Sequence, residues 1–183
     1  MRNCVAAPAA SVTSLNHGEW TLTLIQDCAL ASVSSRVERT TALKEALSQQ
    51  GFEMPFVESF TGDAERGAFW VGPHQYMLWQ PYQANPDWAG QLALGEGVFT
   101  TEQTDGWARI DLAGPNLAAV FERLVNLDAR RWVPGFATRS VLHHIGCFVV
   151  VREDGFSVLV PRSMADSAIH AIEQSMQTVL ALN

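Results

Sequence analysis

The sequence predicts an α+β fold in which helices pack on a largely antiparallel sheet. Three observations predict it: short runs that alternate apolar and polar residues, longer stretches with an apolar residue every three or four positions, and the hairpin pair Asp154-Gly155. Strands and helices mix along the whole chain, and the order after Trp107 has the same rhythm as the order before it. We therefore expect two similar halves within one fold.

The first predicted strand and helix lie near the amino end. Trp20–Ile25, WTLTLI, alternates as a half-buried strand does. Ser35 and Glu38 form a capping-box pattern, so we expect a helix that begins there and stops at Gly51. The core-facing side of this helix would carry Leu43, Ala46 and Leu47.

The middle of the chain predicts four strands and a short helix. Residues 68–81, AFWVGPHQYMLWQP, predict two strands around a turn at Gly72-Pro73. Asn85 as cap and Pro86 as first helical residue predict the short helix. The remaining two strands are predicted at residues 97–103 and 106–114.

Two clearer helices are predicted after these strands. The first begins at Gly114-Pro115, and its apolar face consists of Leu117, Val120, Phe121, Leu124 and Val125. The second begins at Ser163, where Asp166 completes another capping box. Its apolar face consists of Ile169, Ile172, Met176, Val179 and Leu180.

The segment Arg139–Ser163 between these helices predicts a core hairpin. With Asp154 and Gly155 at the turn, Val151 would face Val158, and Val149 would face Val160. Alternation then places one set on each face of the sheet: Cys147, Val149, Val151, Val158 and Val160 on one, and Phe148, Val150 and Leu159 on the other. Because both faces are apolar, we expect other structure to cover both.

Length and composition suggest one domain. Residues 1–17 are rich in Ala and Ser, and we expect a flexible amino-terminal arm there. Residues 18–183 would form a single α+β domain, made of two fused halves at 18–104 and 105–183.

The charge balance disfavours two classes of partner. The formal net charge is −7, and such a field repels nucleic acids and anionic membrane surfaces. No apolar run reaches the roughly 20 residues needed to span a bilayer, and we expect no signal peptide. Three cysteines far apart fit reduced thiols. We therefore expect a cytoplasmic protein.

Residues that could carry chemistry do not form a convincing site. His143 and His144 are neighbours on a strand, so they point to opposite faces and cannot readily hold one metal ion. Cys147 lies in an apolar strand, where its thiol would stay protonated. No dinucleotide, P-loop, G-x-S-x-G or H-E-x-x-H motif is present. Asp111 is the one acid whose burial would be informative. We expect no catalytic, cofactor-binding or metal-binding residue in this chain.

One basic region is a candidate docking surface. Four of the twelve basic residues lie between positions 123 and 139 of this acidic chain, with two aromatic residues among them. Pairing with Glu122 and Asp128 explains part of this pattern. Arginine beside exposed aromatic residues is also typical of interface hot spots. The candidate docking residues are Arg130, Arg131, Trp132, Phe136 and Arg139.

Four segments carry an ordered set of short motifs: Phe69–Leu78, Trp107–Arg130, Pro134–Val151 and Gly155–Ile172. In order they contain G-P before a helix, L-D after it, P-G-x-x-x-R, a hairpin, and V-P-R-S at the start of the last helix. This set resembles the gamma-subunit family of heterotetrameric sarcosine oxidases.

The resemblance implies a small subunit of a bacterial flavoenzyme that oxidatively demethylates sarcosine, N-methylglycine. The products would be glycine, a one-carbon unit at the formaldehyde level and hydrogen peroxide. The implied partners are large flavin-binding alpha and beta subunits and a small delta subunit. NAD, FAD, covalent FMN and tetrahydrofolate would be bound by partner subunits, with no cofactor in this chain. The resemblance also implies a fold similar to the folate-binding aminomethyltransferases, and no catalytic residues in the gamma subunit.

Two alternatives stay open. The chain could be a stand-alone folate-binding or aminomethyltransferase-like protein, in which Asp111 and a tryptophan would face a pterin. A metal-binding redox protein would use His143, His144 and Cys147.

Overall fold

The computed structural model describes residues 10–83 and 87–182. The described strands form two antiparallel sheets. One has six strands: β1 (Ser14–His17), β2 (Trp20–Ile25), β8 (Trp107–Ala113), β9 (Ala137–Leu142), β10 (Ile145–Arg152) and β11 (Gly155–Pro161). The other has five strands: β3 (Cys28–Ser35), β4 (Phe60–Gly62), β5 (Gly67–Gly72), β6 (Gln75–Pro81) and β7 (Val98–Glu102). The helices are α1 (Thr40–Gln49), α2 (Trp88–Gln91), α3 (Leu117–Phe121) and α4 (Ala165–Leu182), with short 3-10 helices η1 (Val37–Arg39), η2 (Ala129–Arg131) and η3 (Arg162–Met164).

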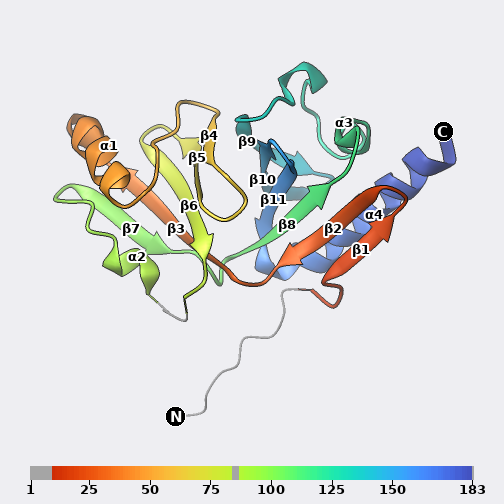
Figure 1. Ribbon diagram of the computed structural model, residues 1–183, viewed down its shortest axis with the longest axis horizontal. Helices are drawn as coiled ribbons and strands as arrows, with labels where there is room; N and C mark the ends of the chain where they lie inside the picture. The colour runs from red at the N-terminus through yellow and green to blue at the C-terminus, as the bar shows by residue number, and fades with distance from the viewer. Residues whose placement is uncertain (1–9, 84–86, 183) are drawn as a thin grey trace, which may run out of the picture.

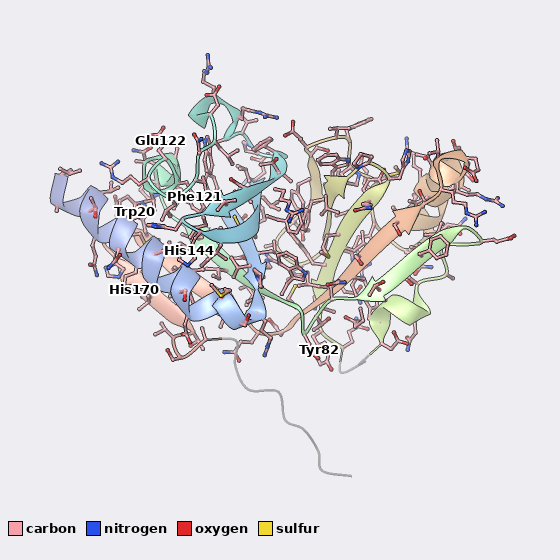
Figure 2. The ribbon with its side chains drawn as sticks, turned by 180° about the vertical axis from the view of Figure 1, so that it is seen from behind. Trp20, Tyr82, Phe121, Glu122, His144 and His170 are labelled. Atoms are coloured by element: carbon pink, nitrogen blue, oxygen red, sulfur yellow. The ribbon has the colours of Figure 1, made fainter. Side chains whose placement is uncertain are left out.

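The two sheets lie between two outer layers of helices (Figure 1). One apolar cluster joins α3 and α4 to the outer face of the six-stranded sheet. A second joins α1 and α2 to the five-stranded sheet, and a third fills the space between the sheets. In the third cluster the rings of Phe69 and Phe148 lie 5.5 Å apart. Figure 2 shows α4 from behind, lying across the strands with Trp20 and Phe121 beside it. The predicted α+β class is confirmed, with two sheets in place of one.

The chain repeats one topology. Repeat 1 is β2-β3-α1-β4-β5-β6-α2, and repeat 2 is β7-β8-α3-β9-β10-β11-α4. Within one sheet, β4-β5-β6-β3 lie side by side, and β9-β10-β11-β8 do so in the other. The first strand of each repeat crosses to the other sheet, so β2 pairs with β8, and β7 pairs with β3. The sheets are therefore completed by a reciprocal exchange of strands, and the division expected between residues 104 and 105 falls between β7 and β8.

Most predicted strands are confirmed, and three strands were not expected: β1, β3 and β4. The strands at Trp20–Ile25, 68–81, 97–103 and 106–114 are confirmed as β2, β5 with β6, β7 and β8. No prediction covers β3, because Ala and Ser are weak strand formers. Pairing with β6 and β7 on its two sides makes β3 an interior strand, where tertiary pairing overrides that weak preference.

Both capping boxes are wrong, and the helices begin later than predicted. Ser35 is the last residue of β3, opposite Val98, and α1 begins only at Thr40 after η1. Ser163 lies inside η3, and Asp166 instead accepts hydrogen bonds from the amide and hydroxyl of Ser11, at 2.9 and 3.0 Å. A carboxylate that tethers a distant segment is not distinguishable from a cap by sequence spacing alone.

The other two helices differ in their details. Asp87 caps α2, accepting from Gly90 N at 3.0 Å, whereas the expected Asn85 and Pro86 lie outside the described residues. Helix α3 ends at Phe121, and Val125 pairs with Leu142 in an isolated bridge. The five predicted core residues of this segment are nonetheless all buried.

The core hairpin has the predicted faces but a different register. Val149 lies opposite Val158, and Val151 lies opposite Phe156, so Glu153 and Asp154 occupy the turn. The register differs from the predicted one by two residues, which leaves every side chain on its predicted face. One set packs against α4 and the other between the sheets, so both faces are covered as expected.

The predicted arm is partly wrong. Residues 1–9 lie outside the described residues, but Ser14–His17 form β1, which pairs with β2. Leu15 packs on the core cluster, and His17 Nε2 lies 3.1 Å from Glu173 Oε1 on α4. These contacts hold the end of the expected arm in the six-stranded sheet.

A glycine substitution tests the hairpin. Gly155 has φ +150°, and an added Cβ would lie 2.0 Å from the carbonyl oxygen of Leu112 on the neighbouring strand. We expect Gly155→Ala to lower the free energy of unfolding by at least about 2 kcal/mol in urea titrations. Gly146→Ala is the matched control, because a Cβ there meets nothing within 4 Å. Equal stability of the two variants would contradict the register.

Candidate functional site

Asp111 lies at the centre of a charge cluster. Strand β8 puts Arg109 and Asp111 on one face, and the guanidinium donates to both carboxylate oxygens at 2.8 and 2.7 Å. Arg152 Nη1 on β10 lies 3.1 Å from Asp111 Oδ2, and Ser157 Oγ on β11 donates to Oδ1 at 2.7 Å. These four residues, the Asp111 cluster, tie three neighbouring strands through one carboxylate.

The arginines of this cluster are buried. Arg109 and Arg152 are only 3% and 6% exposed. The guanidinium of Arg109 lies 4.3 Å from the ring of Trp79, and Arg152 Nε donates to Asp154 at 2.8 Å. That bond from Arg152 lowers the pKa of Asp154. Buried charges persist only when they are paired, and here each guanidinium has a carboxylate partner.

A hollow of about 370 Å³ lies beside the cluster, between the β2–β3 link and the β4–β5 turn. Asp27, Glu65 and Arg109 are among its lining residues. A general base must present a lone pair to its substrate, whereas both oxygens of Asp111 already accept from arginine. The geometry therefore favours a structural cross-link over acid–base chemistry.

The described cysteines lie in the core. Cys28 and Cys147 are buried free thiols. Burial raises the pKa of both, that of Cys147 to about 11, because an ionised thiolate would lose its hydration. Sequence reasoning expected this direction for Cys147.

Thiol reactivity tests this burial. In a Cys4→Ser background at pH 8, we expect both thiols to react with a disulfide reagent at least about 100-fold more slowly in the folded chain than in urea. The raised pKa also means that Cys147 costs no stability at neutral pH. Above about pH 9 the thiol of Cys147 ionises in the unfolded chain but stays protonated in the folded chain. The free energy of unfolding therefore falls as the pH rises through this range. Rapid labelling of the folded chain at pH 8 would show that the strands around Cys147 open easily.

The two histidines lie at the β9–β10 turn. His143 and His144 are both exposed, and His143 has φ +54°. Within residues 10–83 and 87–182, no three His, Cys, Asp or Glu side chains are grouped so as to hold a metal ion. No helix of the same residues is long and apolar enough to cross a bilayer.

The predicted docking residues are divided between surface and core. Arg130 pairs with Asp128 at 2.6 Å, and Arg131 pairs with Glu58 at 2.5 Å and lies over the ring of Phe136. Trp132 and Phe136 pack on the core cluster, whereas Arg139 is exposed on β9. The structure thus brings Arg131 and Phe136 together, and docking by this region stays a prediction.

A larger apolar groove lies beside α1. It has a volume of about 740 Å³, and its lining includes Lys44, Met54, Pro55, Phe56, Trp70 and Tyr76. We name it the α1 groove. The rim residues Phe56 and Val57 are 81% and 70% exposed. Sequence reasoning missed this surface, although Met-Pro-Phe-Val directly after a predicted helix is an unusually apolar loop.

The fold is similar to part of the aminomethyltransferase fold. No protein-family model matches the chain. An aminomethyltransferase from Deinococcus deserti is 30% identical over 106 residues, which are 54% of this chain and 30% of that protein. The matched part thus spans less than a third of that relative. The glycine cleavage system aminomethyltransferase T from Bartonella henselae has a similar structure, with a TM-score of 0.61 at 15% identity, over 84% of this chain and 45% of that one.

A heterotetrameric enzyme contains a chain of the same fold. Heterotetrameric sarcosine oxidase from Corynebacterium sp. U-96, solved in complex with pyrrole 2-carboxylate, matches with a TM-score of 0.76 at 20% identity. The match covers 90% of this chain and 88% of that chain. The resemblance expected from the sequence motifs is confirmed at the level of the fold.

Proposed function

We propose that this chain is the small, non-catalytic gamma subunit of a sarcosine oxidase complex. One observation carries the proposal: the likeness to a chain of the heterotetramer covers 90% of this chain and 88% of that one. A likeness over both chains is what two equivalent subunits would give, whereas a shared fragment would leave much of one chain unmatched. The engagement of Asp111 by two arginines supports a role without acid–base chemistry.

In this proposal the complex acts in the cytoplasm and converts sarcosine to glycine, a one-carbon unit and hydrogen peroxide. Large alpha and beta subunits hold NAD, FAD, covalent FMN and tetrahydrofolate, and a small delta subunit completes the assembly. The gamma subunit contributes surface for docking.

Purification from the native cell tests the proposal. A tagged chain, isolated from cells grown on sarcosine, should elute from size exclusion with larger chains that carry flavin absorbance. The same fraction should form hydrogen peroxide from sarcosine, whereas the separated chain should be colourless and inactive. A chain that elutes only at the size of its 20.1 kDa monomer would contradict the proposal.

Similarity to aminomethyltransferases favours one second candidate, a stand-alone folate-binding protein. Trp79 lies over Arg109 near the hollow beside Asp111, so a pterin bound there should quench tryptophan fluorescence. Titration with tetrahydrofolate measures this, with Trp79→Phe as the matched variant. Absence of quenching at millimolar ligand would remove this candidate.

A further inference from the structure

The α1 groove lies at a position of repeat 1 whose equivalent in repeat 2 is filled by packed aromatic side chains. Tyr76 follows the β5–β6 turn directly after the pair Gly72–Gln75, as Phe156 follows the β10–β11 turn after the pair Arg152–Gly155. Tyr76 therefore corresponds to Phe156. Both face the outer helix layer of their sheet.

The loops that reach these two places also correspond. Phe60 N donates to Gly135 O, and Ala137 N donates to Glu58 O, so the loops meet symmetrically. Counting three residues back from Glu58 and Gly135 places Pro55 at the position of Trp132.

The two helices can be aligned in the same way. Helix α1 buries Leu43 and Leu47, and the segment that contains α3 buries several residues at the same spacing, Val120 and Leu124 among them. We align Leu43 with Val120 because the spacing from Leu43 to Pro55 then equals that from Val120 to Trp132. The next residue in each case is Lys44 in repeat 1 and Phe121 in repeat 2.

Aromatic side chains close the site in repeat 2. Trp132 stacks on Phe156 with ring centroids 5.1 Å apart and planes 16° apart. Phe121 packs edge-on against Phe156 at 4.8 Å. In repeat 1 the corresponding residues are Lys44 and Pro55, and both line the open groove beside Tyr76. The groove thus corresponds to a core position of repeat 2, and it lacks aromatic counterparts of Phe121 and Trp132.

The charge of the α1 groove lining limits which partner groups can bind there. Lys44 and His74 are the basic residues of the groove lining, which contains no carboxylate among the described residues. The lining is therefore basic in a chain of net charge −7. An acidic group beside an aromatic anchor would complement it.

We infer that an aromatic side chain of a larger partner subunit occupies the α1 groove, in the place that Trp132 takes in repeat 2, with an acidic residue of that partner facing Lys44. The inference rests on the proposed function, since it names the docking surface of the same subunit. Exposed Phe56 and Val57 then become rim contacts around the buried anchor.

The first test uses indole-3-acetate as the probe, because it combines the indole of Trp132 with a carboxylate. Titration of the isolated full chain, followed by NMR, should shift the indole N–H of Trp70 with a Kd on the order of 1 mM. Tryptamine, whose charge is reversed, should bind about fivefold more weakly. The double variant Lys44→Phe/Pro55→Trp copies repeat 2, so it should fill the groove and lose the shift. No saturable shift with the wild-type chain overturns the inference, as does unchanged binding by the double variant.

The second test uses the complex. The double variant should be lost from the purified assembly, whereas Val141→Asp, a change at an exposed β9 residue, should be retained. A double variant that still assembles overturns the docking inference and leaves the proposed gamma-subunit role intact. A wild-type chain that never assembles overturns the proposed function and, with it, the partner named here. The two failures are therefore distinct.

Discussion

Replacing Asp111 by Asn should destabilise the fold by about 3–5 kcal/mol. The amide keeps the shape of the side chain but removes the charge that faces the two buried arginines. Asp154, which is largely exposed, would remain as a carboxylate partner of Arg152 alone. Since a domain of this size is stable by about 5–15 kcal/mol, the variant should unfold at far lower urea concentration.

The matched control is Asp128→Asn, which removes an acid from an exposed ion pair. Its partner Arg130 is 90% exposed, so solvent screens the interaction and we expect no measurable change in stability. Urea titrations followed by tryptophan fluorescence compare the two variants. If Asp111→Asn behaves like the control, water reaches the cluster and the ion pairs contribute little.

Replacing all three charged residues of the Asp111 cluster together separates the effect of charge balance on stability from that of hydrogen bonding. Arg109→Met, Asp111→Leu and Arg152→Met in one chain leave no buried unpaired charge, since Asp154, which loses its partner Arg152, is largely exposed. Such apolar replacements of buried ion pairs are often tolerated. We expect this triple variant to recover most of the loss caused by Asp111→Asn alone. A triple variant as unstable as the single one would show that hydrogen bonding within the cluster, including that from Ser157, outweighs its charge balance.

Periodicity predicted the elements that bury one face, and it failed where pairing alone decides. Strand β2 (Trp20–Ile25) follows directly from alternation, because it packs one side on a core. The hairpin faces follow from the strand period of two, although both of them are buried. Strand β3 consists largely of small residues with weak strand preference, and pairing with its neighbours β6 and β7 makes it extended. Capping boxes failed for a related reason, since Ser35 is paired in a sheet and Asp166 bonds to a distant segment.

The candidate sites could likewise be predicted only where local spacing along the chain brings the residues together. Asp111 could be singled out from sequence, and the Arg-x-Asp spacing on a strand placed Arg109 beside it in principle. Arg152 could not be found, because it joins the cluster only through the register of β10, β11 and β8. The α1 groove could not be predicted from the sequence either. It is recognised only when the two repeats are compared in space, because repeat 1 then proves to lack aromatic counterparts of Phe121 and Trp132.

The exchanged strands predict that the halves cannot fold separately. A chain cut between residues 104 and 105 leaves residues 105–183 without β2, whose Trp20, Leu22 and Leu24 belong to the core beneath α4. That fragment would expose the edge of β8 and part of its core. The fragment 1–104 keeps the five-stranded sheet, but β2 loses its partner β8 and stays paired with β1 alone, and the face between the sheets is uncovered.

We therefore expect each fragment alone to lack cooperative unfolding, and an equimolar mixture to recover the circular dichroism and melting transition of the intact chain. The matched control is fragment 1–104 with Leu22→Asp and Leu24→Asp, which leaves the five-stranded sheet untouched but puts charges where β2 must be buried. This control should fail to restore its partner. Cooperative folding of residues 105–183 alone would mean that β2 is dispensable, because the six-stranded sheet would then be stable with an open edge at β8.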